Sequence, residues 1–351
     1  MTLETLAEIG DSLNNPRFSI EVDGEMFADT TGLFSDVTVD RTIDGADHFS
    51  LTLASRFDHE AGAFVDMDWE DMPIGGSIEI EIGYGGDVER VLIGEITEHA
   101  TDFPQSGAPG ITVSGYGRYH ELTRDVHEEQ WDPETSDAEI VEELAAAYGF
   151  TPVVDQTPPG DEFPVENEYD SDAAFLEEKL APRNEDGTGP FEVFVRGEEL
   201  VFQAPRDDAE PQLTLTYGES LGSFAPQLTE AQTHETIEVR HWDQRRKSDI
   251  VGTAEREEGT GTRTIRRPVR SDDHAEAIAE AVLKRELHDR LTGSGTTVGM
   301  PNLEIGEPIR LRGIGDRFSG IYYVESVTHS INSGGYTTDF EVRGALAGGL
   351  P

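Results

Sequence analysis

The sequence predicts a mainly β protein with an α+β insert, in which one chain holds two similar β-barrel domains. Apolar and polar residues alternate in the first and last thirds, whereas helical patterns are concentrated between them. A strand pattern of the first third also recurs about 230 residues later. We divide the 351 residues into an N-terminal arm (1–15), a first barrel (16–118), the insert (119–222) and a second barrel (223–351) with a helix over 272–291, since this length allows two or three domains.

Short strands with glycine-containing turns fill the predicted first barrel. "RFSIEVDGEMF" (17–27) alternates between apolar and polar residues and contains the turn dipeptide Asp23-Gly24. "SDVTVDRTIDGADHFSLTLAS" (35–55) repeats the arrangement around Asp44-Gly45. Asp-Gly between alternating segments is a strong hairpin signal. Several short strands at this spacing are typical of a small barrel or sandwich.

The insert is predicted from two helices and a hairpin. "SDAEIVEELAAAYG" (136–149) begins with the capping box formed by Ser136 and Glu139, and Gly149 ends it. A shorter helix, "SDAAFLEEKLAPR" (171–183), ends near its proline. "PFEVFVRGEELVFQAPR" (190–206) alternates on both sides of a glycine and therefore predicts a hairpin.

The recurring strand pattern covers about forty residues in each copy. "IGGSIEIEIG", "GEITEH" and "GITVSG" in 74–115 match "IGEPIRLRG", "VESVTH" and "YTTDFEVRG" in 305–344, and Glu95 and His99 align with Glu325 and His329. Two unrelated three-stranded meanders would share the alternation, but the common order and spacing favour a duplication. Long periodic repeats usually indicate a solenoid, whereas two copies separated by an insert indicate a duplicated domain. Three such chains would present six similar surfaces around one axis, so a homotrimer could match a six-fold ring.

Composition restricts the classes of function. The chain has 72 acidic and 26 basic residues, a formal charge of −46, and no cysteine. The absence of cysteine excludes disulfides and thiolate chemistry. An acidic, lysine-poor surface suits a cytoplasm at molar salt, where charges are screened beyond roughly 3 Å, so we expect a haloarchaeal type of protein. This charge also argues against direct binding of nucleic acid.

No targeting or membrane-spanning segment is expected. Residues 1–15 have neither the basic head nor the apolar core of a secretory signal. No run approaches 18 apolar residues. We therefore expect a soluble product of the cytoplasm.

With both predicted barrels in view, the sequence resembles the late control protein D family. This family comprises the baseplate hub proteins of contractile phage tails and of phage-tail-like injection systems. The resemblance runs in the family's order from near residue 16 to residue 344. It is carried by "FSLTL" (49–53), "IGGSIEIEIGY" (74–84), "LIGEIT" (92–97), "VSGYGRYHELTR" (113–124), "DSDAAFLEEKLA" (170–181), "IEVRHWD" (237–243) and "GDRFSGIYYVESVTH" (315–329).

The resemblance implies a structural hub, assembled in the cytoplasm and placed in the baseplate of a tail or injection particle. Each chain of such a hub has two similar tube-type β-barrel domains, and the hub is a trimer that adapts a six-fold inner tube to a three-fold central spike. The expected partners are the inner tube protein, a separate spike protein, because this chain stops at "GALAGGLP", and baseplate wedge proteins. A virus tail and a domesticated injection machine both fit the sequence.

Two regions are candidates for contacts with a neighbouring subunit or partner. Residues 240–270 contain nine cations and five acids in an otherwise acidic chain. Arginine forks there could bind carboxylates of the next subunit or of a baseplate protein. The hairpin tips 83–90 and 313–320 occupy similar places in the two copies. From these regions we select Tyr84, Arg245, Arg246, Arg263, Arg266, Arg267, Arg317 and Phe318.

No catalytic, cofactor or metal site is predicted, and we expect the protein not to be an enzyme. His120 and His127 are not in an HExxH motif, and "DMDWED" (66–71) lacks the glycine and the closing glutamate of an EF-hand. Acids are so frequent that a chosen carboxylate pair is uninformative. A tail-associated hydrolase that degrades the cell envelope is the alternative function. A β-rich adhesin is disfavoured because it should carry a signal peptide.

Overall fold

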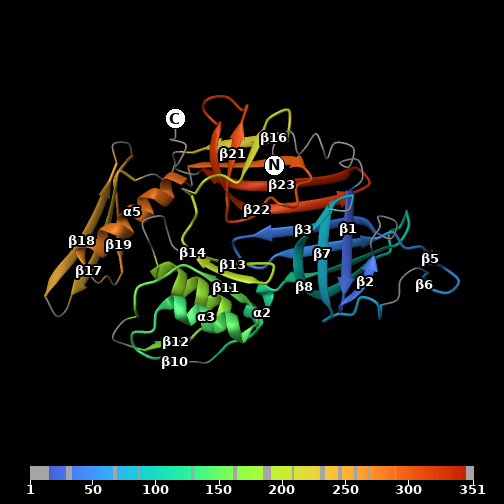
Figure 1. Ribbon diagram of the computed structural model, residues 1–351, viewed down its shortest axis with the longest axis horizontal. Helices are drawn as coiled ribbons and strands as arrows, with labels where there is room; N and C mark the ends of the chain where they lie inside the picture. Colours follow the sequence, from blue (N-terminus) through green and yellow to red (C-terminus); the bar gives the residue numbers. More distant parts are fainter. Residues whose placement is uncertain are drawn as a thin grey trace.

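The computed structural model describes most of the chain. The described residues are 16–28, 34–65, 69–85, 87–127, 130–160, 164–184, 191–207, 209–229, 234–243, 247–256, 259–267, 269, 271–288 and 290–344. The predicted N-terminal arm (1–15) lies outside them. The protein is mainly β with an α+β insert, as the sequence predicts (Figure 1).

One large sheet forms the framework of the molecule. Its thirteen strands follow a path with a side branch, in which β15 (Leu213–Thr216) pairs with β21 (Pro308–Arg312) and β21 pairs with β22. The path is β16 (Leu221–Leu228), β20 (Leu291–Val298), β23 (Gly335–Gly344), β22 (Gly320–Asn332), β3 (Phe34–Thr42), β4 (His48–Leu53), β9 (Gly110–Gly117), β8 (Asp87–Asp102), β7 (Ser77–Tyr84), β1 (Pro16–Val22) and β2 (Glu25–Ala28). Over the described ranges this path has two ends and does not close into a barrel.

The strand order repeats within this sheet. We call β3-β4-β9-β8-β7-β1 the first module and β16-β20-β23-β22-β21-β15 the second module; each is written in pairing order. Irregularities in register recur at matching places in the two modules. The break at 34–36 in β3 matches that at 221–223 in β16, and the break at 96–98 in β8 matches that at 324–326 in β22. The outermost pairs differ, because β1 is antiparallel to β7 whereas β15 is parallel to β21.

The backbone register corrects the residue matches that the sequence suggests. Ile96 accepts a hydrogen bond from the N–H of Gly75 (2.8 Å) and donates one to Gly76. Val324 makes the same two bonds, accepting from Gly306 (2.9 Å) and donating to residue 307. Ile96 therefore corresponds to Val324. The predicted matches of residues 95 with 325 and 99 with 329 are wrong by two positions.

The reason for this error is a difference in segment length. Twenty-one residues separate Gly75 from Ile96, whereas eighteen separate Gly306 from Val324. Matching letters in the second strand alone cannot detect the missing residues in the preceding hairpin. A shift of two residues keeps every side chain on the same face of a strand, so the alternation remains in phase.

The insert forms its own small layer below the large sheet (Figure 1). Ser136 and Glu139 form the predicted capping box at the start of α3. The second predicted helix begins as α4, continues as a π-helical turn η1 and ends in a 3₁₀ turn η2 that contains Pro182. The bounds are α2 (Tyr119–Arg124), β10 (Gln130–Trp131), α3 (Asp137–Ala147), β11 (Thr151–Val154), β12 (Val165–Glu166), α4 (Asp172–Ala174), η1 (Phe175–Leu180), η2 (Ala181–Arg183), β13 (Glu192–Arg196) and β14 (Glu199–Gln203).

A buried arginine joins the insert to the second module. Arg343 of β23 is 1% exposed and donates to Glu192 of β13 and to Glu325 of β22, each at 2.9 Å. Its guanidinium also lies over the ring of Tyr323, whose hydroxyl donates to Glu192. Burial raises the pKa of Glu192, and the charge of Arg343 opposes this shift. The cluster fixes the insert against the sheet.

Residues 236–288 form a separate unit that was predicted as part of the second barrel. β17 (Thr236–Asp243), β18 (Ser248–Glu255) and β19 (Thr262–Arg266) make their own sheet, and α5 (Asp272–His288) packs on it. The helix predicted over 272–291 ends at His288 because β20, a strand of the large sheet, begins at Leu291. The short hairpin of β5 (Phe57–Asp58) and β6 (Ala63–Phe64) projects at the opposite end of the molecule (Figure 1).

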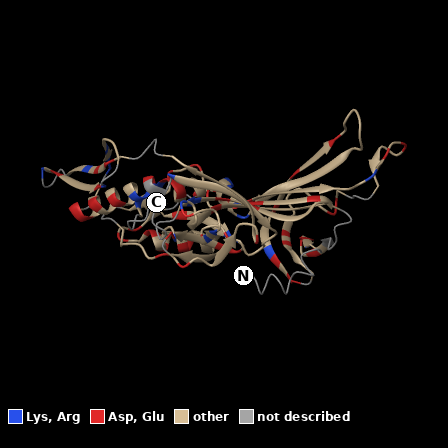
Figure 2. Cartoon of the chain, turned by 90° about the horizontal axis from the view of Figure 1, so that it is seen from above, with Lys and Arg blue, Asp and Glu red and all other residues tan. Residues whose placement is uncertain are grey.

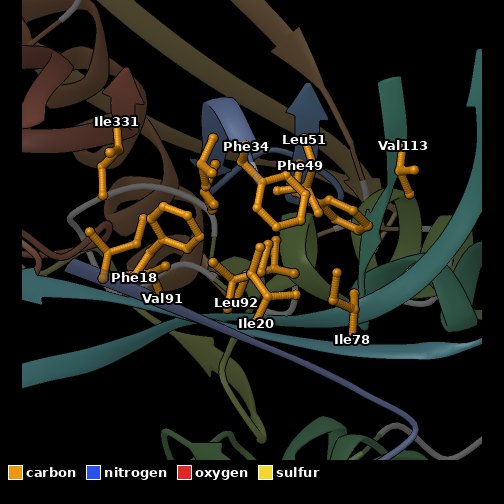
Figure 3. Close-up of a cluster of buried hydrophobic side chains, with 14 of the residues drawn as sticks. Phe18, Ile20, Phe34, Phe49, Leu51, Ile78, Val91, Leu92, Val113 and Ile331 are labelled. Carbon is orange, nitrogen blue, oxygen red and sulfur yellow. The ribbon is translucent and has the colours of Figure 1, made fainter. Parts of the chain in front are cut away.

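The two modules share hydrophobic core. The core of the first module contains side chains from β1, β3, β4, β7, β8 and β9, and it also includes Ile331 and Tyr336 of the second module. Figure 3 shows Ile331 beside Phe18, Phe34 and the other residues of this core. Folding of the first module therefore depends on a strand that lies about 290 residues later in the chain than β3.

Shortening Ile331 should destabilise the whole chain. Ile331 is 3% exposed, so Ile331→Ala should lower the free energy of unfolding by about 2–4 kcal/mol, through lost burial and an unfilled cavity. Denaturant titration at molar salt measures this change. Val298→Ala is the control, because Val298 is 38% exposed and should lose no more than about 0.5 kcal/mol. Equal losses in the two variants would contradict the shared core.

Candidate subunit interface

The two modules are joined by antiparallel pairing of β22 with β3. We call this contact, between residues 326–332 and residues 36–42, the internal junction. The N–H of Ile43 donates to Glu325 (3.1 Å) at its end, and the hydroxyl of Thr328 donates to Asp40 (2.7 Å) within it. The first half of β22 pairs instead with β21, and the change of partner coincides with the irregularity at 324–326.

Buried polar groups lie beneath the internal junction. Arg41 is 3% exposed and donates to Glu304 at 2.9 Å, which ties β3 to a loop of the second module. His329 is fully buried, and its Nδ1 lies 2.9 Å from the hydroxyl of Tyr336. Burial and the charge of Arg41 lower the pKa of His329 to about 3, so its ring is neutral at neutral pH. Burial raises the pKa of Asp47 to about 6, against the opposing effect of Arg41.

Two strand edges that correspond to the internal junction are open within the described residues. β9 pairs with one side of β8 as far as residue 102, whereas β7 pairs with the other side only as far as residue 95. The side that faces β7 is therefore open beyond the irregularity at 96–98. We call residues 98–103 the β8 edge. Apart from a bridge between Leu221 and Tyr217, β16 pairs only with β20 among the described residues, and its other side, over residues 222–228, is the β16 edge. Open edges carry backbone donors and acceptors that can pair with another chain.

Exposed aromatic side chains lie at the end of the β8 edge. Phe57 and Phe64 of the β5–β6 hairpin contact Phe103, with ring centroids 5.2 and 6.0 Å from it. Phe103 is 58% exposed. Trp69 is 38% exposed and packs on the ring of His99, 4.7 Å away. Aromatic groups grouped on a surface are typical of protein–protein contacts.

The arginines selected from residues 240–270 have different surroundings. Arg245 and Arg246 lie outside the described residues. Arg263 donates to Glu286 of α5 at 3.0 Å, and Arg267 donates to the carbonyl of residue 182 in the insert at 2.9 Å. Arg266 is exposed; the pKa of its neighbour Glu238 is lowered mainly by a hydrogen bond from Arg240, and the charge of Arg266 adds to this shift. Arg263 and Arg267 therefore hold the 236–288 unit together and in place.

The residues selected from the two hairpin tips are not brought together. Tyr84 packs against Tyr336 of the second module, with ring centroids 5.5 Å apart, and burial raises its pKa to about 12. Arg317 lies over the ring of Phe318, at 5.7 Å. The hydroxyl of Tyr322 donates to the carbonyl of Phe318 at 2.6 Å. Tyr84 thus belongs to the contact between modules, whereas Arg317 and Phe318 lie on a separate loop.

Sequence reasoning missed the β8 edge and its aromatic cluster. Phe103 falls at the place of Ile331 only when the two copies are aligned by their irregularities in register, which the sequence does not show. The alignment of the two copies by sequence alone is different, so it does not distinguish this exposed phenylalanine from others. Phe57 and Phe64 carry no motif that distinguishes them from core residues.

A shallow groove of about 600 Å³ lies on the large sheet, over β3, β16, β20, β22 and β23. It is lined by hydroxyls and carboxylates together with Arg41, Phe224 and Phe340. Asp40 and Asp339 accept hydrogen bonds from Thr328 and Thr296. Among the described residues, no three His, Asp or Glu side chains are grouped as metal ligands. No described helix is long and apolar enough to cross a bilayer.

Comparison with solved structures defines the class of fold. The chain is similar to the 43 kDa tail protein of prophage MuSo2 from Shewanella oneidensis, with a TM-score of 0.73 and 14% identity over 94% of this chain and 99% of that one. A tail protein of Neisseria meningitidis MC58 gives a TM-score of 0.66 and 13% identity over 94% and 96%. An Escherichia coli component of the type VI secretion system gives 0.59 and 13% over 95% and 79%.

The chain therefore has the fold of phage-tail proteins, and at the level of the fold the predicted resemblance to tail hub proteins is confirmed. Residues 12–267 and 266–333 match the model of the Alg8 N-terminal domain, and the chain belongs to this family. No curated protein matches the sequence.

The buried histidine of the internal junction should give the protein a defined pH dependence. His329 keeps a pKa of about 3 when folded but regains its ordinary value of 6.5 when unfolded. Between these values the unfolded chain binds one more proton, so stability rises with pH and falls on acidification, by about 1.4 kcal/mol per pH unit. His329→Gln should remove this contribution from the slope of unfolding free energy against pH.

Denaturant titrations between pH 6.5 and 4.5 measure the slope of unfolding free energy against pH for the parent and for the variant. The contributions of the other titrating groups cancel when one slope is subtracted from the other. His59→Gln is the matched control, because His59 is exposed and its replacement should leave the slope unchanged. A parallel pH dependence of parent and His329→Gln would contradict a neutral buried ring.

Proposed function

We propose that the protein is the structural baseplate hub of a contractile tail or injection particle. It acts as a homotrimer that adapts a six-fold inner tube to a three-fold central spike, and it is not an enzyme. The observation that carries this proposal is the repeated strand order of the two modules within one sheet. Tail proteins among the similar solved structures support it.

The duplication supplies the geometry that such an adaptor needs. A trimer of chains with two similar modules contains six similar units around its axis, although its true symmetry is three-fold. One rim can then contact six identical tube subunits, while the other rim contacts a trimeric spike. The predicted tube-type barrel is formed on this account by three chains together, because the sheet of one chain remains open over the described residues.

The polar face of the sheet is suited to the lumen of this ring. Cross-strand neighbours opposite the core carry carboxylates, hydroxyls and one imidazole over both modules: His48, Ser50, Ser114, Thr112, Asp40, Thr38, Thr328, Ser330, Asp339, Glu341, Thr296 and Ser294. Figure 2 shows the excess of acidic over basic residues along the chain. We propose that this face lines the axial channel, where its carboxylates keep passing DNA phosphates from adhering.

The remaining partners follow from this placement. The inner tube protein contacts one rim, a separate spike protein the other, and baseplate wedge proteins the outside. Assembly takes place in the cytoplasm. Each chain brings a formal charge of −46 to the particle. Molar salt, as in a haloarchaeal cytoplasm, reduces the range of repulsion to roughly 3 Å.

Mass measurement in molar salt tests the proposal. Sedimentation in concentrated KCl should give about three times the chain mass of 38.5 kDa. Dilution to about 0.01 M salt extends the range of repulsion to roughly 30 Å, so the trimer should dissociate. A monomer or a dimer in molar salt would contradict the hub. A trimer that persists at low salt would contradict only the adaptation to salt.

A further inference from the structure

We infer that the β8 edge of one subunit pairs with the β16 edge of the next, antiparallel and in the register of the internal junction. The inference rests on the proposed trimer and adds the residues that hold it together. Its basis is that each chain already contains one example of the contact: the second module offers β22 to β3 of the first. In a ring, the first module offers β8 to β16 of the neighbouring second module.

The equivalent positions in β3 and β16 follow from their irregularities in register. The break at 34–36 in β3 corresponds to the break at 221–223 in β16, and both lie opposite the next strand of their module. Counted from these breaks, Asp40 corresponds to Gln227 and Val37 to Phe224. The same count places Pro226 at the position of Val39.

The equivalent positions in β8 and β22 follow in the same way. The break at 96–98 corresponds to the break at 324–326. Ala100 then corresponds to Thr328, and Phe103 corresponds to Ile331. The pairing with the third strand agrees, because Ala100 lies opposite Thr112 in β9 and Thr328 opposite Asp339 in β23.

These equivalences fix one register between subunits. In the internal junction Thr328 lies opposite Asp40, and Ile331 opposite Val37. Between subunits the corresponding pairs are Ala100 with Gln227, Thr101 with Pro226, and Phe103 with Phe224. The N–H of residue 229 donates to the carbonyl of residue 290, which directly precedes β20. Because the backbone groups of successive residues in a strand point to opposite sides, those of Leu228, Pro226 and Phe224 point away from β20.

Pro226 makes the contact between subunits weaker than the internal one. It lacks an N–H, so it accepts one hydrogen bond from the facing strand but returns none. A proline with its nitrogen directed away from the sheet is tolerated only at an edge. The contact can thus be made between prefolded subunits, while an isolated β16 edge is a poor template for unrelated strands.

Burial differs between the internal junction and the open edges as this pairing requires. Val37 and Ile331 are 1% and 3% exposed in the internal junction. Their counterparts are less covered: Phe103 is 58% exposed, and Phe224 is only partly buried against the core of the second module. Pairing of the two edges would bring Phe103 over Phe224 and complete that core.

Charge favours this combination of edges over the alternatives. Residues 221–228 contain no charged side chain, whereas the β8 edge carries Glu98 and Asp102. Pairing of β8 with β16 therefore places no carboxylate opposite another. Two β8 edges would bring like charges together across the strands, which is destabilising. A second copy of this chain, offering its β16 edge, is the occupant that fits.

Engineered disulfides test the register, since the chain has no cysteine of its own. Ala100 and Gln227 occupy the places of Thr328 and Asp40, a non-hydrogen-bonded pair whose Cα separation of about 4.5 Å suits a disulfide. Ala100→Cys with Gln227→Cys should link subunits into covalent dimers and trimers under mild oxidation in molar salt. Ala100→Cys with Ser223→Cys, displaced by four residues along the same strand, should link at least tenfold less.

Each other outcome overturns the register. Cross-linking by Ala100→Cys alone would indicate β8 against β8, and cross-linking by Gln227→Cys alone would indicate β16 against β16. Equal linking by the displaced pair, or no linking in a particle of trimeric mass, would leave the proposed hub standing without this contact. A monomeric mass would remove both.

A second variant measures the contribution of the aromatic contact. Phe103→Ser should raise the concentration needed for half-assembly at least tenfold. It should shift the unfolding equilibrium constant of the dissociated chain by no more than about fivefold, or about 1 kcal/mol, because Phe103 is 58% exposed there and loses only its contacts with Phe57 and Phe64. Trp242→Ser is the matched control, since Trp242 is 55% exposed on the remote β17–β19 sheet. Equal effects of the two variants would contradict a role for Phe103 at the interface.

Discussion

The antiparallel pairing of β22 with β3 is the contact on which the rest of the structure depends. It makes one sheet out of two modules, and it carries Ile331 into the core of the first module. It also covers His329 and Arg41. The ring of His329 is neutral and the charge of Arg41 is paired with Glu304, which reduces the free-energy cost of burying these groups away from water. The packing of one module against the other is therefore set within each chain. The same strand pairing can be made between chains with the same geometry.

The duplicated pattern, the insert and the capping box at Ser136 could be predicted from the sequence, because each rests on local periodicity or on turn residues. The register between the copies could not, since a shift of two residues preserves alternation. The separation of β17–β19 was also hidden, because a strand pattern does not reveal which sheet receives it. Tyr84 illustrates the limit: its place at a hairpin tip was correct, but only the fold shows its contact with Tyr336.

Open edges in so acidic a chain combine two physical constraints. An unpaired edge invites association, whereas a charge of −46 opposes it. The β16 edge resolves the conflict through local composition, being free of charge and interrupted by Pro226. Association then becomes conditional on a matching edge and on salt that screens the remaining repulsion. This selectivity suits the closed ring that we propose.

An electron cryomicroscopy map of the particle in molar salt tests the central claim most directly. The account predicts a three-fold ring with a continuous wall of twenty-four strands, eight from each chain along the path from β16 through β22 and β3 to β8. Six similar modules should be visible around the axis. A ring in which β8 and β16 remain unpaired, or an assembly whose modules do not alternate around one axis, would contradict it.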